Sequence, residues 1–302
     1  MRDGHLNPAR VHKPPHRTTD STDTAANTNA NPAASGSGSP LVILIHGGGY
    51  CAGTYEQATP LARILARTYN ATAITISHRF APDHPFPTPA HDAIDAVAWL
   101  ASHAADSGIG ADTAAGFVVG GGSSGASLAG VAVQAWLDAG KEPRVSGVWL
   151  QMPSFLDPSI VPDKWKTLHF AREQNAAAPV LNAESLAYLK ELYRADVGSA
   201  LFSPVGSGGF LTEGRMMPRT YIMVCGMDPV RDDGLVYEKM LREKGVLTRL
   251  DVYAGVPHGV GLFAKAGLEK AKRAERDGVL AFGWLLGREV GVEEVQRAVD
   301  GA

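Results

Sequence analysis

The chain has 302 residues, of which 45% are hydrophobic, so it is long enough to bury a large core in one or two domains. Its 28 basic and 31 acidic side chains give a net charge of −3, which leaves no basic surface for nucleic acid or an anionic membrane. No stretch approaches the roughly 20 apolar residues of a membrane span, and the N-terminus lacks the apolar core of a signal peptide. Cys51 and Cys225 are too few for a disulfide framework or a zinc site, so we expect both to be reduced. These features predict a cytoplasmic protein whose partner is a small neutral molecule.

The first 40 residues divide into a short head, Arg2 to Pro15, and a tail that ends at Ser39 and is rich in Thr, Ser, Asn, Asp, Ala and Gly. The tail has the composition of a flexible linker, which buries too little apolar surface to offset the entropy of ordering. We therefore expect residues 1–40 to be a partly disordered N-terminal segment and residues 41–302 to form the folded domain.

From Leu41 onward, short Val/Ile-rich segments alternate with helical stretches. The short segments do not alternate cleanly between apolar and polar residues, as expected of strands covered by helices on both faces. This rhythm predicts an α/β fold with a mostly parallel sheet. The expected strands are Leu41–Ile45, Ala71–Ser77, Gly116–Val119, Val145–Leu150, Thr220–Cys225 and Leu247–Tyr253, and the helices between them are Glu56–Tyr69, Ala90–Ala105, Ser124–Ala139 and Val230–Lys244.

One interval breaks this rhythm. About 65 residues, from Pro153 to Arg215, separate two strands and contain a helical stretch at Ala183–Arg194. An insertion of that size predicts a cap over the sheet, at about residues 153–215. The end of the chain predicts a long helix at Leu262–Leu286 and a short one at Val292–Val299.

A sharp turn at Ser123 separates the apolar run that begins at Phe117 from an Ala-rich helical stretch. Gly121, Ser123 and Gly125 fit G-x-S-x-G, the nucleophile elbow, in which the flanking residues lack side chains because the chain folds back tightly. The motif predicts a nucleophilic serine.

Two other interpretations of these glycines stay open. Gly120, Gly122 and Gly125 also spell G-x-G-x-x-G, the dinucleotide-binding fingerprint of an oxidoreductase. That interpretation requires an acidic residue about 20 positions later, whereas the next strand ends in Gln151-Met-Pro. The glycines could also form a turn with only a packing role.

Polar residues follow other strands of the expected sheet, and ligands of such sheets bind beyond the carboxyl ends of the strands. His46-Gly-Gly-Gly49 follows the first strand, Asp228 the fifth and His258 the sixth. A serine hydroxyl needs a base within hydrogen-bond reach and a carboxylate that orients the base. The chain order Ser123, Asp228, His258 is the order in α/β-hydrolases.

Each partner of Ser123 has rivals. Asp228 precedes Pro229 and could simply cap a helix, and Asp232 and Asp233 are alternative acids, although they fall inside the helical stretch. We favour His258 because it lies on a loop between the last strand and the last long helix. Structural hydrogen bonds are expected of His78, His84 and His91, and no role is assigned to His5, His12, His16, His103 or His169.

The glycine run after His46 supplies a further requirement of acyl transfer. Negative charge develops on the carbonyl oxygen, and backbone amides freed of side chains can donate to it. An H-G-G-G run has this role in lipases and esterases, together with the amide of the residue after the nucleophile, here Ser124.

With these blocks in this order, the sequence resembles the hormone-sensitive-lipase-like group of α/β-hydrolases, often called the bacterial family IV esterases, which has many fungal members. The resemblance extends from about Arg2 to the last helix. The matching blocks are Leu41 to Tyr50, His78 to Pro87, Gly121 to Gly125, Gly226 to Gly234 and Pro257 to Gly259.

The resemblance implies an α/β-hydrolase sheet with a helical cap, a Ser123–Asp228–His258 triad, and oxyanion donation by the amides of Gly48, Gly49 and Ser124. It implies a carboxylesterase that cleaves esters of short to medium acyl chains, or a lactone, without a metal or an organic cofactor. A receptor or an eliminase that has repurposed the same triad is the alternative within the fold. The oligomeric state, a homodimer included, is open.

The sequence also departs from that group. Many relatives have Asp before the nucleophile and Ala after it, where this chain has Gly122 and Ser124. Arg2-Asp-Gly-His and Ala9 to Pro14 look like the group's early turn and the strand after it, so the chain starts where relatives have already contributed a first strand and cap helices. If no other segment replaces them, we expect a more open pocket and a less stable protein; the alternative is that the sequence is incomplete.

Overall fold

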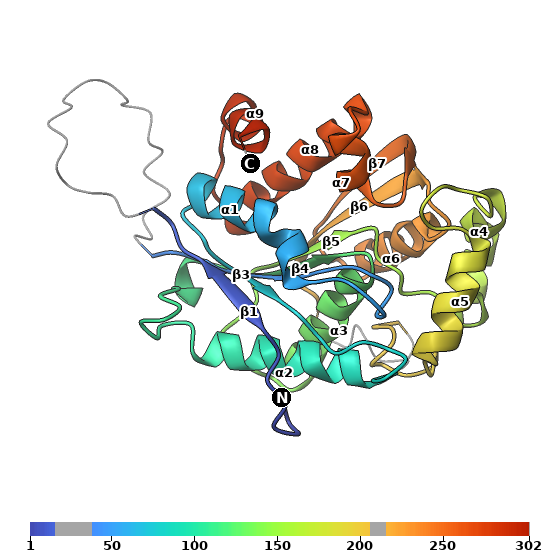
Figure 1. The fold of residues 1–302 in the computed structure, drawn as a ribbon, viewed down its shortest axis with the longest axis horizontal. Helices are drawn as coiled ribbons and strands as arrows, with labels where there is room; N and C mark the ends of the chain where they lie inside the picture. The colour runs from blue at the N-terminus through green and yellow to red at the C-terminus, as the bar shows by residue number, and fades with distance from the viewer. Residues whose placement is uncertain (16–37, 206–215, 302) are drawn as a thin grey trace, which may run out of the picture.

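The computed structural model describes residues 1–15, 38–205 and 216–301. Within these residues the strands form one seven-stranded sheet in the order β1-β3-β2-β4-β5-β6-β7 (Figure 1). Only β1 runs antiparallel to its neighbour, so the expectation of a mostly parallel α/β sheet is confirmed. The strands are β1 (Ala9–His12), β2 (Leu41–Ile45), β3 (Thr72–Ile76), β4 (Phe117–Gly122), β5 (Gly147–Gln151), β6 (Arg219–Met227) and β7 (Thr248–Pro257).

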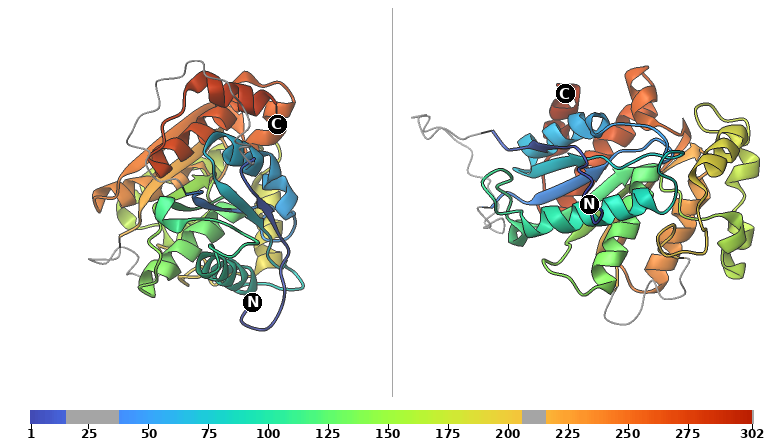
Figure 2. Two further views of the ribbon diagram at one scale, coloured as in Figure 1. Left: turned by 90° about the vertical axis from the view of Figure 1, so that its left-hand side faces the viewer. Right: turned by 60° about the horizontal axis from the view of Figure 1, so that its bottom comes forward.

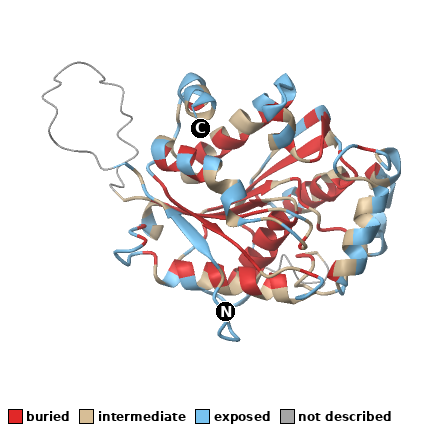
Figure 3. Cartoon of the chain, viewed as in Figure 1, coloured by how far each residue is buried: buried red, intermediate tan, exposed pale blue. Residues whose placement is uncertain are grey.

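Helices cover both faces of the sheet, as Figure 2 shows. Strand β2 explains why: Leu41, Ile43 and Ile45 pack into one core with helices α2, α3 and α6, whereas Val42 and Leu44 pack into a second core with α1 and α8. Every residue of β2 is therefore buried, as are the central strands in Figure 3. The helices are α1 (Thr59–Thr68), α2 (Thr88–Ser102), α3 (Ser124–Asp138), α6 (Arg231–Glu243), α8 (Glu269–Leu286) and α9 (Val292–Asp300), with short 3₁₀ turns η1 (Tyr55–Ala58) and η2 (Thr113–Ala115).

The expected helix at Leu262–Leu286 is two helices, α7 (Val260–Lys265) and α8, and that prediction was wrong. Gly267, with a φ of +92°, ends α7. The backbone N–H of Leu268 donates to Phe263 O at 2.9 Å, and that of Gly267 donates to Ala264 O at 3.0 Å. This pair of bonds is a Schellman cap, which requires the left-handed backbone that glycine adopts without strain. The apolar periodicity continues across the break, so it did not reveal it.

The head of the chain belongs to the sheet. Ala9–His12 forms β1 and pairs with β3, at the position where the resemblance implies a strand. The sheet therefore includes residues before 41. The linker-like tail that the composition predicts falls largely at residues 16–37, outside the described residues.

The cap lies between β5 and β6 and extends past the carboxyl ends of the strands (Figure 1). Its described elements are η3 (Pro158–Ile160), η4 (Asp163–Leu168), α4 (Ala171–Gln174) and α5 (Ala183–Tyr193), and residues 206–215 of the expected insertion lie outside the described part. Tyr193 at the end of α5 stacks on Tyr50, just after the His46 glycine run, with ring centroids 3.9 Å apart. The cap thus touches the loop that the sequence assigns to the oxyanion. In the described part of the chain, no helix is long and apolar enough to cross a membrane.

Candidate active site

Ser123 lies between β4 and α3 with φ 55° and ψ −126°, a backbone conformation that costs energy for any residue other than glycine. Its N–H donates to Gln151 O at 2.7 Å, which fixes the turn against β5. A side chain at Gly121 would overlap the carbonyl oxygen of Gly125, and one at Gly125 would overlap the carbonyl oxygen of Ile45. The two glycines of the motif are therefore required by space, which is the arrangement expected of a nucleophile elbow.

The glycines of the dinucleotide interpretation serve packing instead. A methyl group at Gly120 would lie 2.7 Å from Trp149 O, and one at Gly122 would lie 3.3 Å from Gln151 Oε1. Gly120 therefore lets β4 and β5 approach each other, as the packing interpretation expects of a glycine here.

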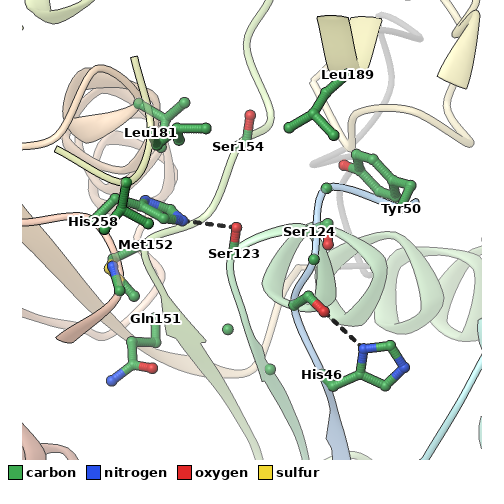
Figure 4. A pocket seen from close by; sticks show the side chains of 18 of the residues that line it. His46, Tyr50, Ser123, Ser124, Gln151, Met152, Ser154, Leu181, Leu189 and His258 are labelled. Atoms are coloured by element: carbon green, nitrogen blue, oxygen red, sulfur yellow. Dashed lines mark hydrogen bonds between the residues drawn. The ribbon is translucent and has the colours of Figure 1, made fainter. Parts of the chain in front are cut away.

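The structure brings the three predicted residues together. Ser123 Oγ lies 2.9 Å from His258 Nε2, and His258 Nδ1 lies 2.7 Å from Asp228 Oδ2 (Figure 4 shows the first of these bonds). Asp228 is fully buried, and its other carboxylate oxygen accepts the backbone N–H of Val230 at 2.9 Å. Asp228 thus orients the imidazole and also makes the local turn bond that the capping alternative anticipated.

The glycine run after His46 wraps around the turn at Ser123. Gly48 has a φ of +129° and Gly49 one of +62°, and a side chain on Gly48 would overlap Ala52 O. Both glycines line the same cavity as Ser123 and Ser124. Ser124 is the first residue of α3, where a backbone N–H has no acceptor inside its own helix. The predicted oxyanion donors therefore belong to one wall of one cavity.

The His46 side chain contacts the glycine loop and a second buried histidine. Its Nδ1 lies 2.7 Å from Gly47 O, and its ring stacks on His78 with centroids 4.8 Å apart. Burial lowers the pKa of both imidazoles, that of His78 to about 4, so both rings are neutral near pH 7. His78 Nδ1 lies 2.9 Å from Arg79 O, which is the structural role that the sequence predicts for it.

The rival acids Asp232 and Asp233 lie on α6 and face the cap. Asp232 accepts the backbone N–H groups of Phe170 and Ala171 at 2.8 and 2.6 Å, and Asp233 accepts that of Leu156 at 3.0 Å. Both acids are buried, so they anchor the cap to the body of the protein.

His169, to which the sequence assigned no role, lies 2.8 Å from Asp233 and completes this anchor together with Arg172. The only sequence signal was a pair of adjacent acids in the first turn of an expected helix, which is also an ordinary choice for an exposed helix start. Cys51 and Cys225 are both free thiols, and no cluster of three metal-ligating side chains occurs among the described residues.

The cavity in front of Ser123 has a volume of about 970 Å³ and lies between the cap and the ends of the strands. Its walls come from the glycine loop, the elbow, the β5 end, the cap helix α5 and the segment after His258. A buried carboxylate, an imidazole and a hydroxyl in hydrogen-bonded series at the floor of such a cavity can activate the hydroxyl as a nucleophile.

This fold with this arrangement defines an α/β-hydrolase. A family model described as the alpha/beta hydrolase fold matches residues 42–262, and the chain belongs to that family. The resemblance to the hormone-sensitive-lipase-like group is thereby confirmed.

Curated relatives and solved structures agree with this assignment. The chain is 29% identical over 246 residues to an AB hydrolase superfamily protein of Schizosaccharomyces pombe, covering 82% of this chain and 71% of the relative. It is 28% identical over 254 residues to a versiconal hemiacetal acetate esterase of Dothistroma septosporum, covering 83% and 75%. Among solved structures, a vibralactone cyclase superposes with a TM-score of 0.80 at 27% identity, covering 94% of this chain and 78% of that one.

Proposed function

We propose that the chain is a carboxylic ester hydrolase in which Ser123, His258 and Asp228 form the catalytic triad. One observation carries the proposal: the unbroken series of hydrogen bonds from Asp228 through His258 to Ser123, at 2.7 and 2.9 Å. The similarity to a fungal acetate esterase supports the choice of an ester as the bond that is cleaved.

In the acylation step, Ser123 Oγ attacks the ester carbonyl while His258 Nε2 takes the hydroxyl proton. Asp228 holds the imidazole in the tautomer with a proton on Nδ1 and stabilises the imidazolium that forms. The amides of Gly48, Gly49 and Ser124 donate to the carbonyl oxygen as its negative charge develops. The intermediate then expels the alkoxide, which leaves as the alcohol with the proton from Nε2.

In the deacylation step, a water molecule attacks the acyl-serine while His258 Nε2 takes a proton from the water. The second intermediate releases the carboxylic acid, and the proton returns from Nε2 to Ser123 Oγ. One ester and one water give one acid and one alcohol, so the cycle needs neither a metal nor an organic cofactor.

The family resemblance supports an ester or lactone of short to medium chain as the substrate. A cavity of about 970 Å³, at the upper end of small-molecule sites, has room for such a molecule. A cytoplasmic location and the exclusion of nucleic-acid and membrane partners stay predictions, and the oligomeric state, a homodimer included, stays open. Cell fractionation and sedimentation analysis of the purified protein test them.

The test is hydrolysis of p-nitrophenyl esters from acetate to dodecanoate by the wild type and by Ser123→Ala. We expect turnover that is highest for short to medium acyl chains and is lost in the variant, with an unchanged circular dichroism spectrum. Undiminished turnover by Ser123→Ala would contradict the triad. Tight binding of an ester without turnover by the wild type would instead favour a receptor, and consumption of NAD(P)H would favour an oxidoreductase.

A further inference from the structure

The two sides of the cavity in front of Ser123 differ in chemistry. The side under the cap is mostly apolar, because α5 and the segment before it contribute Leu181, Leu186, Leu189 and Tyr193. The opposite side lies between the end of β5, α7 and α8, and there two polar side chains, Gln151 and Glu275, line the wall together with the charged Lys265 of α7.

The packing of α8 on β5 explains why these two side chains are neighbours. A methyl group at Gly147 would lie 2.8 Å from Leu285 Cδ2, and Trp149 Nε1–H donates to Gly278 O at 2.9 Å. As β5 advances from Gly147 to Trp149, its partner on α8 therefore moves back from Leu285 to Gly278, so the two elements run antiparallel.

One further step along each element leads to the two polar residues. Gln151 is two residues after Trp149 and lies on the same face of the sheet. Glu275 is three residues before Gly278 and lies on the same face of the helix. The two positions therefore lie opposite each other at the carboxyl edge of the sheet, where Ser123 is.

Both side chains lie close to backbone positions that neighbour the catalytic residues in sequence. A methyl group at Gly122, the residue before Ser123, would lie 3.3 Å from Gln151 Oε1. One at Gly261, three residues after His258, would lie 3.4 Å from Glu275 Oε1. Figure 4 shows Gln151 on the side of Ser123 opposite to Leu189 of the cap.

Neither side chain is hydrogen-bonded within the described protein. No hydrogen bond or ion pair joins the Gln151 carboxamide or the Glu275 carboxyl to another described residue, although both are partly buried. None of their polar atoms is among the buried unpartnered atoms of the described residues, so water reaches them and a ligand hydroxyl can take the place of that water. Burial raises the pKa of Glu275, against the opposing effect of the Lys265 charge, so its carboxyl keeps a proton to higher pH than an exposed glutamate does.

We propose that Gln151 and Glu275 form a polar subsite that binds a hydroxyl group carried by one half of the ester, while the apolar cap side holds the other half. This proposal rests on the proposed ester hydrolase and narrows its substrates to hydroxylated esters. The carboxamide offers both a donor and an acceptor, and the carboxyl supplies a second hydrogen bond to the same hydroxyl.

The test measures binding to the Ser123→Ala protein, so that it does not depend on turnover. Dissociation constants are measured by ligand-detected NMR for two pairs of esters of equal size. The first pair is 2-hydroxyethyl butyrate and propyl butyrate, with the hydroxyl on the alcohol half. The second pair is methyl 6-hydroxyhexanoate and methyl heptanoate, with the hydroxyl on the acyl half.

We expect the hydroxylated ester to bind roughly 3- to 10-fold tighter than its partner in one of the two pairs, since that is about the range for one net hydrogen bond. The pair that shows the preference identifies the half of the ester that faces the subsite. Gln151→Met or Glu275→Met should bring the ratio close to one, whereas Glu275→Gln, which keeps the hydrogen-bonding groups, should preserve it. Glu269→Met, at the exposed start of the same helix, is the matched control and should leave the ratio unchanged.

Equal affinities within both pairs, or a preference that survives both Met variants, would overturn the subsite. Because the readout is a ratio of affinities, a general loss of affinity in a variant does not change it. Failure of the wild type to hydrolyse any ester would contradict the proposed function, and the binding preference would still be measured independently.

Discussion

The substitution Asp228→Asn removes the negative charge of the triad and keeps a side chain of the same shape. Asp228 Oδ1 accepts the N–H of Val230 at 2.9 Å, so the amide oxygen of an asparagine must keep that position. The amide NH₂ then faces His258 Nδ1, which has to accept rather than donate a hydrogen bond. The proton moves to Nε2, and the imidazole can no longer take the Ser123 proton.

From this reversed tautomer we expect kcat/KM to fall about 10⁴-fold, which corresponds to about 5 kcal/mol of transition-state stabilisation. The assay is hydrolysis of p-nitrophenyl butyrate, with circular dichroism to show that the fold is kept. Asp251→Asn is the control, because Asp251 lies at the sheet edge, where it accepts the Tyr221 hydroxyl and forms a 4.0 Å ion pair with Arg249. An Asp228→Asn enzyme that keeps more than a tenth of wild-type kcat/KM would refute this reasoning.

Three further substitutions test the framework around the site. Gly125→Ala places a methyl group against the carbonyl oxygen of Ile45 and should lower the free energy of unfolding by about 3 kcal/mol in urea denaturation, whereas Gly291→Ala, where nothing lies within 4 Å, should not. His78 is buried and neutral with a pKa of about 4, so folding stability is lost as pH falls from 6.5 toward 4, by about 3 kcal/mol. His78→Phe should flatten this dependence in unfolding curves, and an unchanged slope would rule the imidazole out as its source. Asp233→Ala removes the acceptor of the Leu156 N–H and of Arg172 in the cap, so we expect the free energy of unfolding to fall by roughly 3–5 kcal/mol and limited proteolysis to cut the cap faster. Equal cleavage rates in the variant and the wild type would contradict the anchor.

The residues of the site could be predicted because their positions follow from chain topology. Ser123, Asp228 and His258 each come directly after a strand of the sheet, and parallel strands present their carboxyl ends at one edge. The glycines at 121 and 125 were readable for a related reason, since only the absence of a side chain allows the close approaches at those two positions.

Other features depend on contacts that no local pattern encodes. The function of Asp233 is decided by the cap segment that folds over it, about 60 residues earlier in the chain. Gln151 and Glu275 become neighbours only through the register of α8 on β5. The end of α7 before Gly267 was missed because the apolar spacing continues past it, whereas the Schellman cap depends on hydrogen bonds to the carbonyl oxygens of Phe263 and Ala264.

The central claim is that Ser123 carries the acyl group during turnover. The most direct measurement is mass spectrometry of the protein quenched in acid during hydrolysis of p-nitrophenyl butyrate, followed by peptide mapping. We predict a butyryl adduct on the peptide that contains Ser123, and its absence from Ser123→Ala. A butyryl group on any other residue, or full turnover with no adduct at residue 123 and no labelling there by a fluorophosphonate, would contradict the account.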